Sequence, residues 1–276
     1  MSFIVSIMFS FFAVIALLLV VSVGVGMANM HYLFGVVIPY LAIITFILGF
    51  IYRVVGWAKS PVPFRITTTC GQQKTLPWIK ANNLESPYNT IGVIKRMALE
   101  VLFFRSLFRN TSVELKDGPR VAYWSAKWLW LAGLAFHWSL LIIVTRHLRF
   151  FTEPVPCFVH LLENIDGIFE IGVPALFLTD GVILAAITHL FLRRVFVPKM
   201  RYISLPSDYF PLFLIFGIVF SGALMRHFYK ADLISIKELA IGLVSFHPVI
   251  PEGIGLVFYI HLFFEALCLF IFHSAS

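Results

Sequence analysis

Histidines inside long apolar stretches are the residues of this chain best suited to chemistry. His137 and His147 lie ten residues apart in one stretch, and His261 lies in another. Ten helical residues rise about 15 Å and turn the two side chains about 80° apart, so His137 and His147 cannot share a metal ion but can each ligate one. His261 lies at a depth in the membrane similar to that of His147, so these two side chains can meet. His137 lies at a different depth and cannot easily reach His261. A pair of histidines from two helices holds haem b in many proteins. The alternative explanation for histidines at these positions is that they form hydrogen bonds between helices.

Charged residues near these histidines suggest further roles. Glu265 follows His261 by one helical turn and shares its face. Asp180 lies within another apolar stretch, where an acid is costly, and it can either accept a proton from a bound quinol or pair with a basic residue such as Arg146 or Arg149. These two arginines flank His147 and can equally neutralise haem propionates.

The composition places these residues in a membrane protein. Of the 276 residues, 60% are hydrophobic and 13% are charged, against about 45–50% and 25% in soluble domains. The three cysteines lie at positions 70, 157 and 268, which excludes CxxC zinc sites, CxxCH haem attachment and a four-cysteine iron–sulfur site. A redox centre in this chain must therefore use other ligands.

Apolar runs predict an all-α, polytopic bundle of about six transmembrane helices. They cover residues 3–27, 32–52, 124–144, 173–192, 209–225 and 254–272. Segment 53–120 carries eleven Lys and Arg residues against four acids, so the positive-inside rule places it, and both chain termini, in the cytoplasm. The net charge of +7 then reflects uneven loops, and no nucleic-acid partner is expected.

Three segments follow from this pattern. We expect two N-terminal transmembrane helices in 1–52, a basic cytoplasmic segment in 53–120, and a four-helix domain in 121–276. Within the basic segment, residues 91–109 mix bulky apolar side chains with Lys95, Arg96, Arg105 and Arg109. This mixture predicts a helix that lies in the headgroup plane with its cations toward lipid, or a docking face for a cytoplasmic partner, and the two are compatible. Residues 65–88 are polar and predict an irregular loop.

Several motifs after about residue 91 resemble a family of membrane cytochromes b. This is the quinone-interacting subunit of the complex associated with dissimilatory sulfite reductase, also described as the heterodisulfide-reductase-like menaquinol-oxidizing complex; it is similar in turn to the gamma subunit of respiratory nitrate reductase. The apolar stretches 3–27 and 32–52 match this family only in their apolar character. The motifs are Glu100-Val-Leu-Phe-Phe-Arg-Ser-Leu-Phe-Arg-Asn-Thr111, Lys127-Trp-Leu-Trp130, Ala135-Phe-His-Trp-Ser-Leu-Leu-Ile-Ile143, Arg146-His-Leu-Arg-Phe-Phe151, Arg201-Tyr-Ile-Ser204, Asp208-Tyr-Phe-Pro-Leu-Phe-Leu214, Gly222-Ala-Leu-Met-Arg226 and Ser245-Phe-His-Pro248.

The resemblance implies two haems b, an outer one held by His147 and His261 and an inner one held by His137. The second ligand of the inner haem would fall at position 279, past Ser276. His273 is a poor substitute because it is rotated by about 120° from His261, so the outer haem is the safer expectation.

The resemblance also implies a biological setting. Menaquinol would bind near the outer haem, with Asp180 or Glu265 as the acceptor of its protons, in the cytoplasmic membrane of a prokaryote. Electrons would leave to a heterodisulfide-reductase-like iron–sulfur subunit on the cytoplasmic face, within a respiratory complex of sulfur metabolism. Two alternatives remain open at this point: a haem-free membrane anchor, and a small ion or proton transporter lined by His137, Asp180 and Glu265.

Overall fold

The computed structural model describes residues 3–60, 78, 80, 82–116, 120–167 and 177–274. The chain divides into two compact units, Met1–Ala58 with Ala135–Ser276 (unit 1) and Lys59–Leu134 (unit 2). Helix α5 (Lys127–His147) begins in unit 2 and ends in unit 1. Each unit is described by itself.

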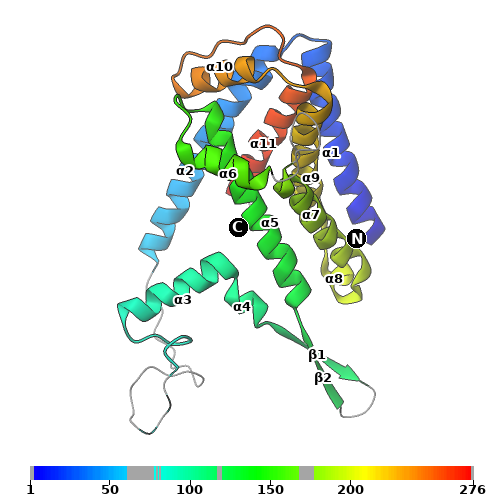
Figure 1. The fold of residues 1–276 in the computed structure, drawn as a ribbon. Coiled ribbons are helices and arrows are strands. Elements are labelled where there is room, and N and C mark those ends of the chain that lie inside the picture. Colours follow the sequence, from blue (N-terminus) through cyan, green and yellow to red (C-terminus); the bar gives the residue numbers. More distant parts are fainter. Residues whose placement is uncertain are drawn as a thin grey trace. The chain divides into compact units, whose positions relative to one another are not determined.

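Helices form unit 1 throughout its described part (Figure 1). Besides the end of α5, they are α1 (Phe3–Gly26), the π-helical turn η1 (Leu33–Val37), α2 (Ile38–Lys59), the short turn η2 (Leu148–Phe150), α6 (Cys157–Asp166), α7 (Leu178–Phe196), α8 (Pro198–Ile203), α9 (Pro206–Leu224), the π-helical turn η3 (Met225–Tyr229), α10 (Leu233–Val244) and α11 (Leu256–Ser274).

The core of unit 1 forms where α9 packs against α1, α7 and α11. Small residues allow these helices to approach: a Cβ atom on Gly217 of α9 would lie 2.9 Å from the ring of Phe264 on α11. Ser10 of α1 donates a hydrogen bond to the carbonyl of Pro206. The buried apolar side chains of this core are Val14, Val21, Val25, Phe34, Leu214, Tyr259, Phe263 and Phe264.

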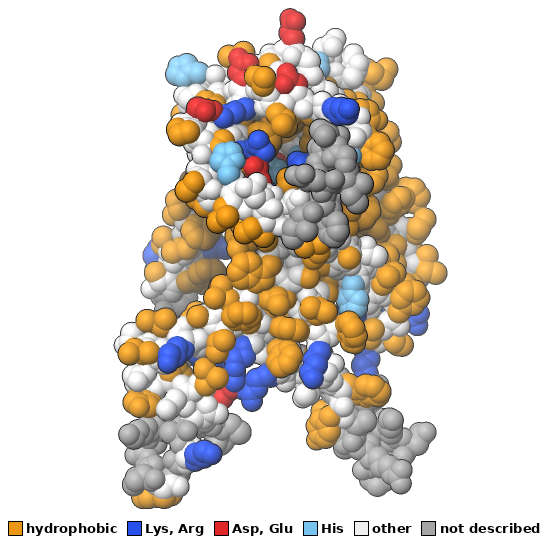
Figure 2. Space-filling view, in the orientation of Figure 1, with side chains coloured by type: hydrophobic (Ala, Val, Ile, Leu, Met, Phe, Trp, Pro, Cys, Tyr) orange, Lys and Arg blue, Asp and Glu red, His pale blue; other side chains and the backbone are white. Residues whose placement is uncertain are grey.

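Four helices are long and apolar enough to cross a membrane by length and composition: Phe3–Gly26, Leu33–Lys59, Lys127–Phe150 and Pro206–Tyr229. Leu256–Ile271 is a shorter apolar helix. These segments confirm an all-α polytopic membrane bundle. Hydrophobic side chains cover most of the visible helical surface of unit 1, whereas charged side chains gather near the end that carries α6 and α10 (Figure 2).

The fourth expected span matches α7, which is not among these four helices. Its described part begins at Leu178, and residues 173–176 lie outside the described residues. Three charged residues, Asp180, Arg193 and Arg194, lower its hydropathy. The count of six crossings stays a prediction.

Unit 2 contains α3 (Thr90–Phe103), α4 (Arg105–Phe108) and the antiparallel strands β1 (Thr111–Lys116) and β2 (Arg120–Ser125). The helix expected over 91–109 is present but interrupted at Phe104, whose φ of 48° is left-handed. Glu100 caps the next helix by accepting hydrogen bonds from the backbone and hydroxyl of Ser106, and these bonds lower the pKa of its carboxyl.

The hairpin corrects one expectation. The third span was predicted to begin at Trp124, but Trp124 and Ser125 lie in β2, and α5 begins at Lys127. The sequence carried a signal for this: Asp117-Gly118-Pro119 separates the two strands in the sequence, and Asp-Gly is a common hairpin dipeptide. The loop expected over residues 65–88 falls largely outside the described residues.

Candidate functional site

Two histidines from different helices face each other in unit 1. His147 ends α5, and His261 lies in the second turn of α11. Their ring centres are 6.4 Å apart and their planes differ by 17°. His261 is 8% exposed. The structure therefore brings together the two histidines that we expected to pair because of their similar depth in the membrane.

Hydrogen bonds on the far sides of the two rings orient them. Nδ1 of His147 lies 2.7 Å from the carbonyl oxygen of Ile143, and because a carbonyl only accepts, Nδ1 carries the proton. Nδ1 of His261 lies 2.9 Å from Oγ of Ser221, and that hydroxyl donates to the carbonyl of Ile218. Nδ1 of His261 therefore donates to Ser221. Because Nδ1 is engaged in both rings, Nε2 is the nitrogen of each that could ligate a metal, which is the usual arrangement around a ligating imidazole.

A glycine makes room for the second ring. A Cβ atom on Gly222 of α9 would lie 3.2 Å from Cε1 of His261, closer than ordinary van der Waals contact. Ser221 and Gly222 thus act together, since the serine anchors one ring nitrogen and the glycine admits the ring edge. This places the His261 imidazole tightly against α9.

Glu265 adds a carboxylate to the pair. Its Oε1 lies 3.2 Å from Nε2 of His261, and its side chain is 42% exposed. One donor atom each from His147, His261 and Glu265 lies within 4.8 Å of the other two. Three acceptors that converge in this way favour a proton or a metal cation between them.

The pair fits bis-histidine ligation of haem iron. Two metal–imidazole bonds of about 2 Å each, with roughly 1 Å from each nitrogen to its ring centre, place the two ring centres about 6 Å apart. The observed separation of 6.4 Å is close to that value. Binding to iron would require Oε1 of Glu265 to move from Nε2 of His261, and the partial exposure of this carboxylate leaves it room.

His137 does not join this pair among the described residues. His137 is exposed and packs at 5.1 Å against Phe136. Within the described part of the chain, no group of three potential metal ligands contains His137. The side chain of His273 lies outside the described residues, and His189 on α7 is exposed. An inner haem at His137 stays a prediction.

A buried charge cluster lies beside the pair. Arg146, 7% exposed, places Nη1 2.7 Å from Asp166 and Nη2 3.2 Å from Asp180. Asp166 also accepts hydrogen bonds from the backbone and hydroxyl of Thr179, at 2.9 and 2.6 Å. The structure thus realises the pairing of Asp180 with Arg146, one of the two roles that the sequence left open for this acid.

An aromatic ring extends the cluster. The guanidinium carbons of Arg146 and Arg226 lie 3.6 and 3.8 Å from the ring centre of Phe177, distances that allow cation–π attraction. Arg149 pairs instead with Glu163 of α6 at 2.6 Å and remains 36% exposed. Of the two arginines expected to meet propionates, Arg149 is therefore the more accessible.

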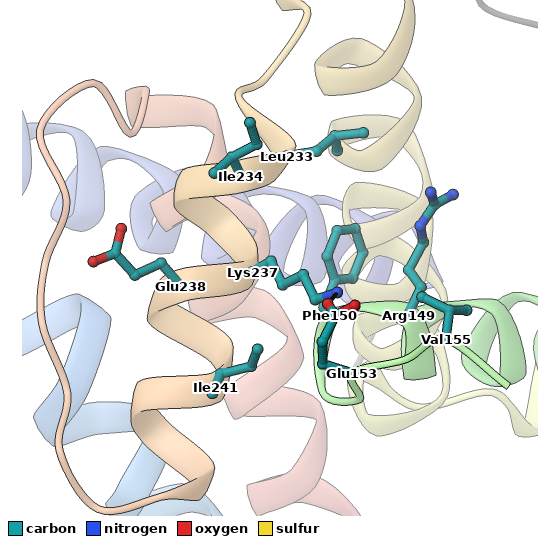
Figure 3. A pocket seen from close by; sticks show the side chains of 9 residues that line it. All are labelled: Arg149, Phe150, Glu153, Val155, Leu233, Ile234, Lys237, Glu238 and Ile241. Atoms are coloured by element: carbon teal, nitrogen blue, oxygen red, sulfur yellow. Dashed lines mark hydrogen bonds and ion pairs between the residues drawn. The ribbon is translucent and has the colours of Figure 1, made fainter.

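A cavity of about 470 Å³ opens between α10 and the segment that follows α5. Phe150 lines it and also contacts the ring of His147 at 5.8 Å between centres. Figure 3 shows Lys237 reaching from α10 toward Glu153, with which it forms an ion pair. The remaining lining residues are Arg149, Val155, Leu233, Ile234, Glu238 and Ile241.

Sequence reasoning missed several members of this site. Asp166 lies in the expected outer loop, where an acid is unremarkable, and only its burial reveals its importance. Ser221 directly precedes the Gly222–Arg226 motif, but its contact with His261 spans forty residues. The cavity depends on the position of α10, and no sequence pattern marked residues 233–244 as a transmembrane or catalytic segment.

Comparison with known proteins provides two relatives. The chain is 45% identical over 236 residues to the Hdr-like menaquinol oxidoreductase cytochrome b-like subunit of Archaeoglobus fulgidus. It is 41% identical over 237 residues to the subunit of the same name from Archaeoglobus profundus. Each match covers 83% of this chain and 70% of the relative. No family model matches the chain.

Proposed function

This chain belongs to the family of Hdr-like menaquinol oxidoreductase cytochrome b-like subunits, and we propose that it holds haem b and exchanges electrons between menaquinol and an iron–sulfur partner. The observation that supports this most directly is the facing pair of His147 and His261. Haem b, when bound, supplies a one-electron centre whose potential depends on its axial ligands and surroundings.

His147 and His261 are the residues that would hold the outer haem. Their Nδ1 hydrogen bonds to Ile143 and Ser221 hold the rings in place, which keeps Nε2 directed to the metal. Arg149, being partly exposed, is the better candidate for a propionate partner, whereas Arg146 would first have to leave Asp166 and Asp180. His137 is proposed as a ligand of an inner haem, with His273 as a weak second ligand.

The test is the haem content of purified variants, measured by pyridine haemochrome and by the reduced-minus-oxidised spectrum. We expect His147→Ala and His261→Ala each to lose the outer haem. His189→Ala is the matched control, since it removes an exposed histidine from another helix and should keep the wild-type content. A folded wild-type chain without haem after haem-replete expression would overturn the proposal and favour a membrane anchor or a transporter.

Glu265 and Asp180 are proposed as acceptors of the quinol protons. Glu265 lies beside the histidine pair, and its partly exposed carboxylate can take up and release a proton. Asp180 pairs with Arg146, so protonation would weaken that ion pair. We expect Glu265→Gln to slow quinol-dependent haem reduction more than Asp180→Asn does, at unchanged haem content. Unchanged rates in both variants would remove these residues from the proposal.

The partner and location complete the proposal. We place the chain in the cytoplasmic membrane of a prokaryote, within a respiratory complex of sulfur metabolism. In unit 2, helix α3 exposes Ile91, Ile94 and Val101 by 62–66%, which suits contact with lipid. The basic segment 53–120 is the proposed docking surface for a heterodisulfide-reductase-like iron–sulfur subunit. Cross-linking from Lys95 to that subunit in the native complex tests this surface, and its absence would contradict it.

A further inference from the structure

Helix α10 carries apolar side chains on both of its sides. Its inner side packs into unit 1 and includes Ile236 and Leu239, which are 8% and 0% exposed. Its outward side is 37–80% exposed and carries Leu233, Ile234, Ile241 and Val244. Ile234 and Ile241 lie about two helical turns apart and therefore share one face. A helix that is apolar all round requires an apolar medium on each side, and the described part of unit 1 supplies it on the inner side only.

Polar and aromatic contacts fix which side of α10 faces outward. Tyr40 of α2 donates a hydrogen bond to the carbonyl of Leu243 at 2.9 Å, and its ring stacks on that of Phe246 with 6.0 Å between centres. Earlier in the helix, Lys237 forms an ion pair with Glu153 in the segment after α5 (Figure 3). Helix α10 is thus tied to two other parts of unit 1, and its outward side cannot turn inward while these contacts hold.

Helix α10 lies where the membrane-spanning part of unit 1 ends. It follows the candidate span Pro206–Tyr229 almost directly, and Figure 1 shows it across one end of the bundle, whereas α1 and α9 run along the bundle. Its 12 residues rise about 18 Å, which is too short to cross about 30 Å of hydrocarbon. Apolar helices of this length are typical of interfacial segments in membrane proteins.

Exposed aromatic rings flank α10 at both ends. Phe228 and Tyr229 precede it and are 77% and 67% exposed, and Phe246 follows it and is 79% exposed. Aromatic side chains gather in this way at the level where spans enter the headgroup region. Lys230 lies beside them in the sequence, and a lysine can reach lipid phosphates from that level. The outward side of α10 therefore continues the lipid-facing surface of the preceding span, and lipid is the occupant that requires no further partner.

We propose that α10 lies in the headgroup region of the membrane, with the side chains of Ile234 and Ile241 against the ends of the acyl chains. Glu238 sets the depth of the helix. Its side chain points away from Lys237 and Glu153 (Figure 3) and carries a charge that is costly inside hydrocarbon. This part of α10 therefore stays at the level of headgroups and water. The lipid contact does not depend on haem.

Photo-crosslinking of the full chain in native membranes tests this placement. The photoreactive residue p-benzoylphenylalanine replaces Ile234 or Ile241, and mass spectrometry identifies the molecule to which its benzophenone attaches after irradiation. Ile44 is the matched positive control, because it is 51% exposed and lies in the candidate span Leu33–Lys59. Glu252 is the negative control, because it is a charged, exposed residue between α10 and α11. We expect lipid adducts at both positions of α10, in yields similar to that at Ile44 and at least about fivefold above that at Glu252.

Two results would overturn the proposal. Adducts with another polypeptide at Ile234 and Ile241 would identify a protein partner or a second copy of this chain as the cover of α10. Yields as low as that at Glu252, beside lipid adducts at Ile44, would place the outward side of α10 in water. Haem content in the same membranes reports on the histidine pair alone, so either result leaves the proposed function to its own test.

Discussion

His147 and Arg146 are neighbours in the sequence, yet they serve two different regions of unit 1. His147 faces His261 and keeps a nitrogen free for a ligand. Arg146 points into the charge cluster, where Asp166 and Asp180 compensate its charge. Successive helical residues point about 100° apart, so one turn of α5 can supply both regions.

The two regions differ in how their polar groups are satisfied. In the charge cluster, each carboxylate already has a cation or hydrogen-bond donor, so the cluster can tie α5 to α6 and α7. In the histidine pair, hydrogen bonds fix the far side of each ring and leave acceptors converging on the near side. The first arrangement is that of a structural tie, and the second is that of a ligand site.

Removing a carboxylate from the charge cluster should have the largest effect. Asp166→Ala leaves the buried Arg146 with one carboxylate partner, Asp180, and removes both hydrogen bonds to Thr179. We expect a loss of about 3–5 kcal/mol in stability, measured by thermal unfolding in detergent. Glu163→Ala is the control: its partner Arg149 is 36% exposed, so the loss should stay below about 1 kcal/mol. Equal losses would contradict the contrast between the two pairs.

Substitutions at the histidine pair should change the affinity for haem instead of the stability of the fold. Ser221→Ala removes the acceptor that orients His261, and changes of this kind weaken metal affinity by about 10–100-fold. Haem titration of the apo chain measures the effect. Ser245→Ala is a control, because the hydroxyl of Ser245 bonds only to the carbonyl of Gly242 among the described contacts. If Ser221→Ala bound haem with the affinity of the wild type, the contrast between the charge cluster and the histidine pair would be contradicted.

A smaller effect is expected at the glycine beside His261. The Cβ atom of Gly222→Ala would lie 3.2 Å from the ring, so the ring must shift by a few tenths of an ångström. We expect haem affinity to fall by less than in Ser221→Ala, with a small change in the haem spectrum. Gly181→Ala on α7 meets nothing within 4 Å and should leave both unchanged. A spectral change in that control would show that packing at His261 is not the cause.

The smallest effect concerns the start of α10. Asp232 accepts hydrogen bonds from Ser235 and from the backbone of Ile234, which lower the pKa of its carboxyl from the ordinary 3.8. A lowered folded-state pKa adds stability that is complete above about pH 4 and is lost as the pH falls through the folded value. Hydrogen exchange in α10 should therefore accelerate in acid. Asp232→Asn, which keeps the cap but does not titrate there, should remove this acid-dependent acceleration, and an unchanged acid response would refute it.

Much of this molecule could be predicted from its sequence. Apolar runs and the scarcity of charge indicated an all-α membrane bundle, because hydrocarbon requires helices whose backbone bonds are internal. Helical rise made His147 and His261 a plausible pair, and resemblance indicated the family that the relatives confirm. The strand at Trp124 was missed because an apolar run does not distinguish a strand from the start of a helix.

Tertiary structure alone decided the rest. The sequence could place an acid at 180 and arginines at 146 and 149, but not which of them pair, since that depends on where α6 and α7 meet α5. It gave no sign of Asp166 or Ser221, whose roles arise from contacts across thirteen and forty residues. Local spacing determines which face of a helix a residue occupies. Only the packing of helices determines what that face meets.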